Sequence, residues 1–162
     1  MNPYLRNETE AEEFDKIVDI AMQLFSGRKK RRQMAEKQIL ALGAKSVRPL
    51  AYTIELALWD HSMDDDDIDG REEDVSDIIL QIGNDALPDL NYLATNGGCN
   101  ISINEWAQYL IFEMTGAKGE ERQKVCHHFT FLDYSKEDKN ILICPACGSR
   151  IPADKKSNGG DE

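Results

Sequence analysis

Apolar residues recur at helical spacing along most of the chain. Glycines, prolines and capping residues divide this pattern into segments of helical length. The sequence predicts seven helices, at about residues 9–26, 28–42, 46–59, 72–82, 85–95, 102–115 and 120–125. In the first of them the apolar positions are three or four residues apart and so share one face, and they are Phe14, Ile17, Val18, Ala21, Leu24 and Phe25.

The helical pattern contains an internal repeat. The segment Ile39–Leu50 aligns with Ile79–Leu90 at an offset of forty residues, and a fainter third copy covers residues 110–118. Each unit consists of a helix, a corner that begins with glycine, and a second capped helix. A helix pair of this size cannot bury its apolar face alone, so we expect neighbouring pairs to stack.

The corners at Gly43 and Gly83 resemble those of HEAT repeats, in which a glycine after the first helix is followed by a proline early in the second. The resemblance covers about residues 8–125 and implies a mostly α fold, a short α-solenoid of stacked helix pairs. One departure is that Pro49 and Pro88 differ by one position in the alignment. An irregular helical bundle is the alternative.

The pattern changes after residue 125. Two segments rich in β-branched and aromatic residues, 128–134 and 140–144, flank a polar run and predict a β-hairpin centred near Glu137. We therefore divide the chain into HEAT-like helical repeats at 1–125, a zinc-binding hairpin at 126–153 and a disordered tail at 154–162.

Cysteine and histidine gather in this last part of the chain. Cys144 and Cys147 form a C-x-x-C pair, and Cys126 and His128 precede it. Two thiolates on a tight turn, with a further Cys and a His, are the ligand set of a closed structural Zn²⁺ site. The run Cys-Pro-Ala-Cys-Gly resembles the knuckle of zinc-ribbon proteins.

Some ligand assignments stay open. His127 replaces His128 if Cys126 ends a helix, and Cys99 is an alternative to either histidine. A redox C-x-x-C pair is a further interpretation, although no thioredoxin-like strand and helix surround it.

Charge is distributed unevenly. The chain has a net charge of −11. Residues 1–48 carry a net +3, residues 49–117 a net −14 with Arg71 as their single base, and residues 118–162 are balanced. This asymmetry favours association with a protein that has a basic surface. A run of five cations offers a possible contact for a partner or for phosphate, at Arg28, Lys29, Lys30, Arg31 and Arg32.

The acidic run Asp64–Gly70 partly matches a calcium loop. Asp65, Asp67 and Asp69 stand at the first, third and fifth positions of an EF-hand, but Ser76 replaces the bidentate glutamate at the twelfth. We expect a solvated acidic loop between two helices, with Ca²⁺ binding as the less favoured alternative.

No enzyme motif is recognised, so an enzyme is the less favoured class. We expect a cytoplasmic adaptor or scaffold for protein–protein interaction, with no membrane segment. The alternative is a nucleic-acid-associated protein that uses the zinc hairpin and the basic run.

Overall fold

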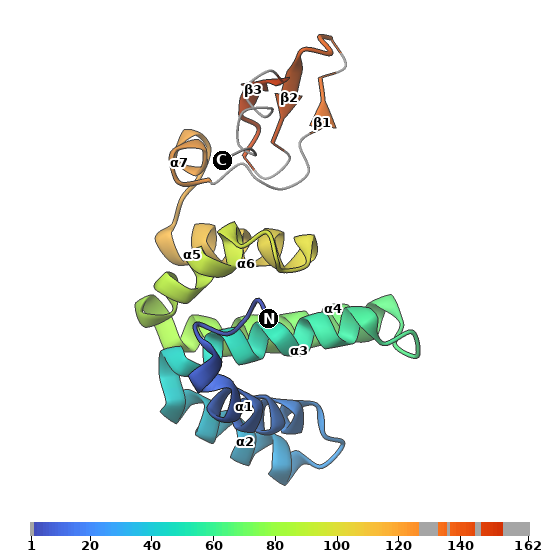
Figure 1. The fold of residues 1–162 in the computed structure, drawn as a ribbon, viewed down its shortest axis with the longest axis vertical. Helices are drawn as coiled ribbons and strands as arrows, with labels where there is room; N and C mark the ends of the chain where they lie inside the picture. The colour runs from blue at the N-terminus through green and yellow to red at the C-terminus, as the bar shows by residue number, and fades with distance from the viewer. Residues whose placement is uncertain (1, 127–132, 136, 145–146, 154–162) are drawn as a thin grey trace.

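A computed structural model describes residues 2–126, 133–135, 137–144 and 147–153 of the chain. It confirms a mostly helical fold followed by a small antiparallel sheet (Figure 1). The α-helices are α1 (Ala11–Met22), α2 (Lys29–Leu42), α3 (Val47–Trp59), α4 (Asp65–Ile82), α5 (Leu87–Thr95), α6 (Ile101–Thr115) and α7 (Glu120–Val125). Short 3₁₀ turns join or extend them: η1 (Glu8–Glu10), η2 (Gln23–Phe25), η3 (Gly43–Ser46) and η4 (Gly83–Ala86).

The helices stack in sequence order along the long axis of the molecule. Helix α1 contacts α3, and α3 contacts α5, while α4 packs between α2 and α6. Figure 1 shows the α1/α2 pair at one end, then α3/α4, then α5/α6, with α7 and the sheet at the other end. Each interior helix thus buries its apolar face against helices from two neighbouring pairs.

The forty-residue repeat has a structural counterpart at the two corners. Gly43 and Gly83 both adopt positive φ angles, of 58° and 75°, where side chains other than glycine are strained. Each glycine is the first residue of a 3₁₀ turn that leads into the next helix, and η3 and η4 lie in contact. Equivalent apolar positions are buried as well, since Ile39, Ile79, Leu50 and Leu90 have no exposed surface.

Helix α4 begins seven residues earlier than expected, because the acidic run is helical and is not a loop. The side chain of Asp64 caps it by accepting a hydrogen bond of 2.9 Å from the backbone N–H of Asp67. Acidic side chains in the first turn are favourable beside the positive end of the helix dipole. The expectation of an acidic loop at Asp64–Gly70 is therefore wrong.

The C-terminal sheet has three strands in the order β1 (Asp133–Tyr134), β2 (Ile141–Ile143) and β3 (Arg150–Pro152), all antiparallel. Asp133 pairs with Ile143, so the β1–β2 turn is centred on residue 138, one position later than expected. The sequence did not predict β3. The predicted tail at 154–162 lies outside the described residues.

Candidate metal centre

Three cysteines from two separate segments converge at the junction between the helices and the sheet. Cys126 directly follows α7, Cys144 follows β2, and Cys147 lies in the turn before β3. Their sulfur atoms all lie within 4.8 Å of one another, and the Cys126 and Cys144 sulfurs are 3.7 Å apart. Zinc–sulfur bonds of about 2.3 Å in a tetrahedron place two sulfurs about 3.8 Å apart. The three thiols could therefore hold a metal ion.

The turn that presents Cys147 is set by backbone hydrogen bonds and one glycine. Gly148 has a φ of 74°, and its N–H donates to the carbonyl oxygen of Cys144 over 2.7 Å. The Cys144 N–H in turn donates to the carbonyl oxygen of Ser149 over 3.0 Å. A residue with a β-carbon is strained at such a φ, so glycine is the residue suited to close this turn.

The environment of Cys147 favours its thiolate. Burial raises the pKa of this thiol, but hydrogen bonds from the Ser149 side chain and backbone, together with the thiols of Cys144 and Cys126, lower the pKa by more. The Cys147 sulfur lies 3.2 Å from the Ser149 hydroxyl oxygen. Because the thiolate is the form that binds metals, this shift supports coordination.

Helix α6 supplies the apolar support beneath the cysteines. Phe112 is 1% exposed and packs in one cluster with Ala117, Cys126 and Cys144. The guanidinium of Arg122 lies 5.1 Å from the centre of the Phe112 ring, and its Nε donates to the Ala117 carbonyl over 3.1 Å. The cysteine cluster thereby joins the last long helix of the stack to the sheet.

The predicted ligands divide into three groups in the structure. Cys126, Cys144 and Cys147 are brought together, whereas His127 and His128 lie outside the described residues. Cys99 is not part of the cluster, because it lies beside Tyr4, where burial raises the pKa of its thiol to about 11.

The other predicted site residues do not form a metal site. The five cations of Arg28–Arg32 are all exposed around the start of α2. Asp65, Asp67 and Asp69 lie on α4, where alternate residues point to different sides of the helix. Among the described residues, the cysteines form the one group whose ligand atoms approach closely enough to share an ion, so an EF-hand calcium site at these aspartates is not formed.

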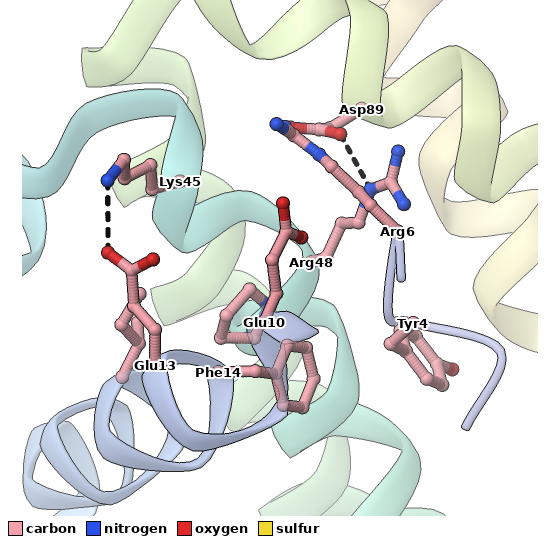
Figure 2. Close-up of a pocket in the computed structure, with 10 residues that line it drawn as sticks. Tyr4, Arg6, Glu10, Glu13, Phe14, Lys45, Arg48 and Asp89 are labelled. Carbon is pink, nitrogen blue, oxygen red and sulfur yellow. Dashed lines mark hydrogen bonds and ion pairs between the residues drawn. The ribbon is translucent and has the colours of Figure 1, made fainter. Parts of the chain in front are cut away.

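A second polar cluster was missed by the sequence analysis. Asp89 of α5 is buried and binds two arginines, with 2.6 Å to Nε of Arg48 and 2.6 Å to an Nη atom of Arg6. The Arg48 guanidinium also lies 3.7 Å from the centre of the Tyr92 ring. Figure 2 shows Asp89, Arg48 and Arg6 beside a cavity of about 120 Å³, which Lys45 and Glu13, paired with one another, also line.

This cluster helps to attach the N-terminal segment to the helices. Tyr4 is 1% exposed, and its hydroxyl donates to a carboxylate oxygen of Glu55. The carbonyl oxygen of Pro3 accepts hydrogen bonds from Tyr92 and Asn96, over 2.7 and 2.8 Å. Asp89 follows a proline in an ordinary helix start, so no local signal distinguishes it as a buried anion.

Comparisons of the chain with protein-family models, with curated proteins and with solved structures give no significant match. No helix among the described residues is long and apolar enough to span a bilayer. The cysteine cluster and the surfaces of the helices are the features of the molecule that bear on its function.

Proposed function

We propose that the protein is an adaptor or scaffold module in which HEAT-like helix pairs present a binding surface and a structural Zn²⁺ centre closes one end of the stack. The main observation in support of this proposal is that the sulfur atoms of three cysteines lie close together and that these cysteines pack against Phe112 of α6. A metal there would cross-link the end of α7 to the sheet at the place where the stack would otherwise show apolar surface to water.

The donor set favours zinc. Thiolate ligands select soft or borderline ions, and closed sites with three or four cysteines are typical of structural zinc. The fourth ligand in this proposal is His128, with His127 as the alternative. Four protein ligands leave no open position for substrate, so the centre has a structural and not a catalytic role.

The metal proposal is tested by elemental analysis of protein purified without chelator. We expect about one zinc per chain and, for Cys144→Ser, loss of the metal and faster proteolysis between residues 126 and 153. Cys99→Ser is the matched control, because Cys99 lies outside the cluster and its variant should retain zinc. A fully folded wild-type protein without metal would contradict the proposal.

The interaction role is tested by recovering partners from native lysate and mapping their contacts by cross-linking. We expect protein partners whose cross-links fall on the helices and whose binding weakens with salt. A nucleic-acid role is the second candidate, favoured by the exposure of all five cations at 28–32. It predicts salt-sensitive binding to mixed-sequence DNA or RNA that is lost when these five residues become glutamine.

A further inference from the structure

The N-terminal segment, residues 2–6, lies on the helices as a short peptide lies on a docking site. Its side chains and its Pro3 carbonyl form hydrogen bonds with α3, with α5 and with the loop before α6, between 51 and 93 residues further along the chain. Within the described part of the chain, α1, the helix that follows the segment, forms no hydrogen bond with it. The same contacts could therefore be made by a segment of another chain.

The segment forms a turn that its own residues stabilise. The N–H of Leu5 donates to the carbonyl oxygen of Asn2 over 3.1 Å, and the N–H of Tyr4 donates to the side-chain oxygen of Asn2 over 2.9 Å. Asparagine at the first position of a turn and proline at the second favour this conformation. A short peptide with this sequence is thus preorganised for binding, which lowers the entropic cost of docking.

The docking site matches the side chains of this turn. Tyr4 is 1% exposed, its ring centre lies 5.2 Å from that of Tyr52, and its hydroxyl donates to Glu55. Two residues later, Arg6 pairs over 2.6 Å with Asp89, whose side chain is 3% exposed. The site therefore recognises an aromatic ring, its hydroxyl group and a cation two residues after it.

Gly98 is an independent indication that the site is shaped for this turn. Of the glycines in the described residues, it is the one whose β-carbon would meet a neighbour, because that atom would lie 3.0 Å from Cβ of Pro3. Its neighbour Gly97 would meet no atom within 4 Å, and neither glycine has a positive φ. Close approach of the proline, and not backbone strain, therefore favours glycine at position 98.

The docked segment leaves one donor of the site unmatched. Nη1 of Arg48 is buried and has no hydrogen-bond partner in the part of the chain that the structure describes, although Nε pairs with Asp89. Arg48 lines the cavity of about 120 Å³ together with Tyr4 and Arg6 of the segment (Figure 2). A buried donor without an acceptor is unfavourable. A segment that supplies an acceptor here would therefore bind more tightly than residues 2–6.

We infer that this is a docking site for a turn of the form Asn-Pro-Tyr-x-Arg from another protein, and that residues 2–6 occupy it in the absence of that partner. An occupant in the same chain has an effective concentration on the order of millimolar. The partner displaces it by adding the hydrogen bond that Arg48 lacks. The inference names a class of partner for the interaction role proposed above and rests on that role.

The test uses the full chain with Tyr4→Ala/Arg6→Ala, which removes the ring and the cation that hold the segment. The probe is a fluorescein-labelled peptide with the sequence of residues 1–7. Anisotropy should show saturable binding to this variant and at least about tenfold weaker binding to the parent, whose site is occupied. A peptide with alanine in place of its tyrosine should bind the variant at least about tenfold more weakly.

Two glycine substitutions, each added to Tyr4→Ala/Arg6→Ala, separate docking from stability. Gly98→Ala places a β-carbon where the proline of the peptide packs, so binding should fall at least about threefold while the melting temperature without peptide is unchanged. Gly97→Ala is the matched control and should leave the affinity unchanged, because its β-carbon meets no atom. Equal effects of the two substitutions on affinity would overturn the inference.

Circular dichroism shows whether Tyr4→Ala/Arg6→Ala is folded. If it is unfolded alone, the peptide should restore its helical signal in a saturable manner. Failure to restore that signal, failure of a folded variant to bind the peptide, or equal affinity of variant and parent would overturn the inference.

Two further outcomes distinguish this site from its alternatives. A parent protein that dimerises at high concentration, and no longer does so with Tyr4→Ala/Arg6→Ala, would identify a second copy as the occupant and overturn the assignment to another protein. The broader interaction role fails separately, if native lysate yields no protein partner that cross-links to the helices.

Discussion

Replacing Asp89 with asparagine should destabilise the protein substantially, because it leaves a buried arginine without its counter-ion. The Asp89 side chain is 3% exposed and that of Arg48 is 12% exposed, whereas Arg6 is 47% exposed. Breaking a buried pair costs about 3–5 kcal/mol, and an exposed pair contributes about 0–1 kcal/mol. The amide oxygen of asparagine can still accept one hydrogen bond, so we expect a loss of about 2–4 kcal/mol.

The measurement is urea unfolding followed by circular dichroism, with two controls. Arg6→Gln removes the exposed partner and should cost less than about 1 kcal/mol. Asp85→Asn changes an exposed acid in the neighbouring η4 turn and should lie within about 0.5 kcal/mol of the parent. If Asp89→Asn proves no less stable than Asp85→Asn, the buried Asp89–Arg48 pair does not stabilise the fold.

Two further predictions use the titrating groups. Burial, together with the neighbouring charge of Asp69, raises the pKa of Glu72; the folded state then binds a proton more tightly than the unfolded state, so ionised Glu72 opposes folding at neutral pH. Glu72→Gln should therefore be more stable than the parent at neutral pH. Urea unfolding at several pH values should show that this difference in the free energy of unfolding shrinks as the pH falls through the raised pKa of Glu72. A difference that does not change with pH would contradict this prediction. Burial raises the pKa of Cys99 to about 11, so its thiolate fraction at pH 8 is about one in a thousand. After chelation, a thiol-reactive dye should label three thiols quickly and one slowly, and Cys99→Ser should lose the slow phase; four equal rates would refute the assignment.

The helices were predictable because their ends carry local signals. The glycines at the two corners mark the ends of α2 and α4, and a strained φ confirms why glycine is there. The start of α4 was misjudged because a run of acids suggests a solvated loop until its cap and the helix dipole are considered. Helix α6 begins at Ile101, one residue before the expected start, and Asn100 caps it.

The sequence could indicate the metal centre only through cysteines that lie at a characteristic spacing along the chain. Cys144 and Cys147 are close in sequence and indicate a knuckle, and the sulfur of Cys126 lies close to theirs, as expected. Asp89 could not be assigned, because its partners Arg6 and Arg48 lie 83 and 41 residues away.

The attachment of residues 3–6 to α3 and α5 has a consequence for biosynthesis. The carbonyl of Pro3 finds its hydrogen-bond donors 89 and 93 residues further along the chain. During translation residues 3–6 therefore stay without these hydrogen-bond donors until α5 has emerged, 89 to 93 residues later, whereas α1, α2 and α3 can already pair locally. The attachment of residues 3–6 to the later helices therefore follows the assembly of the first helix pairs.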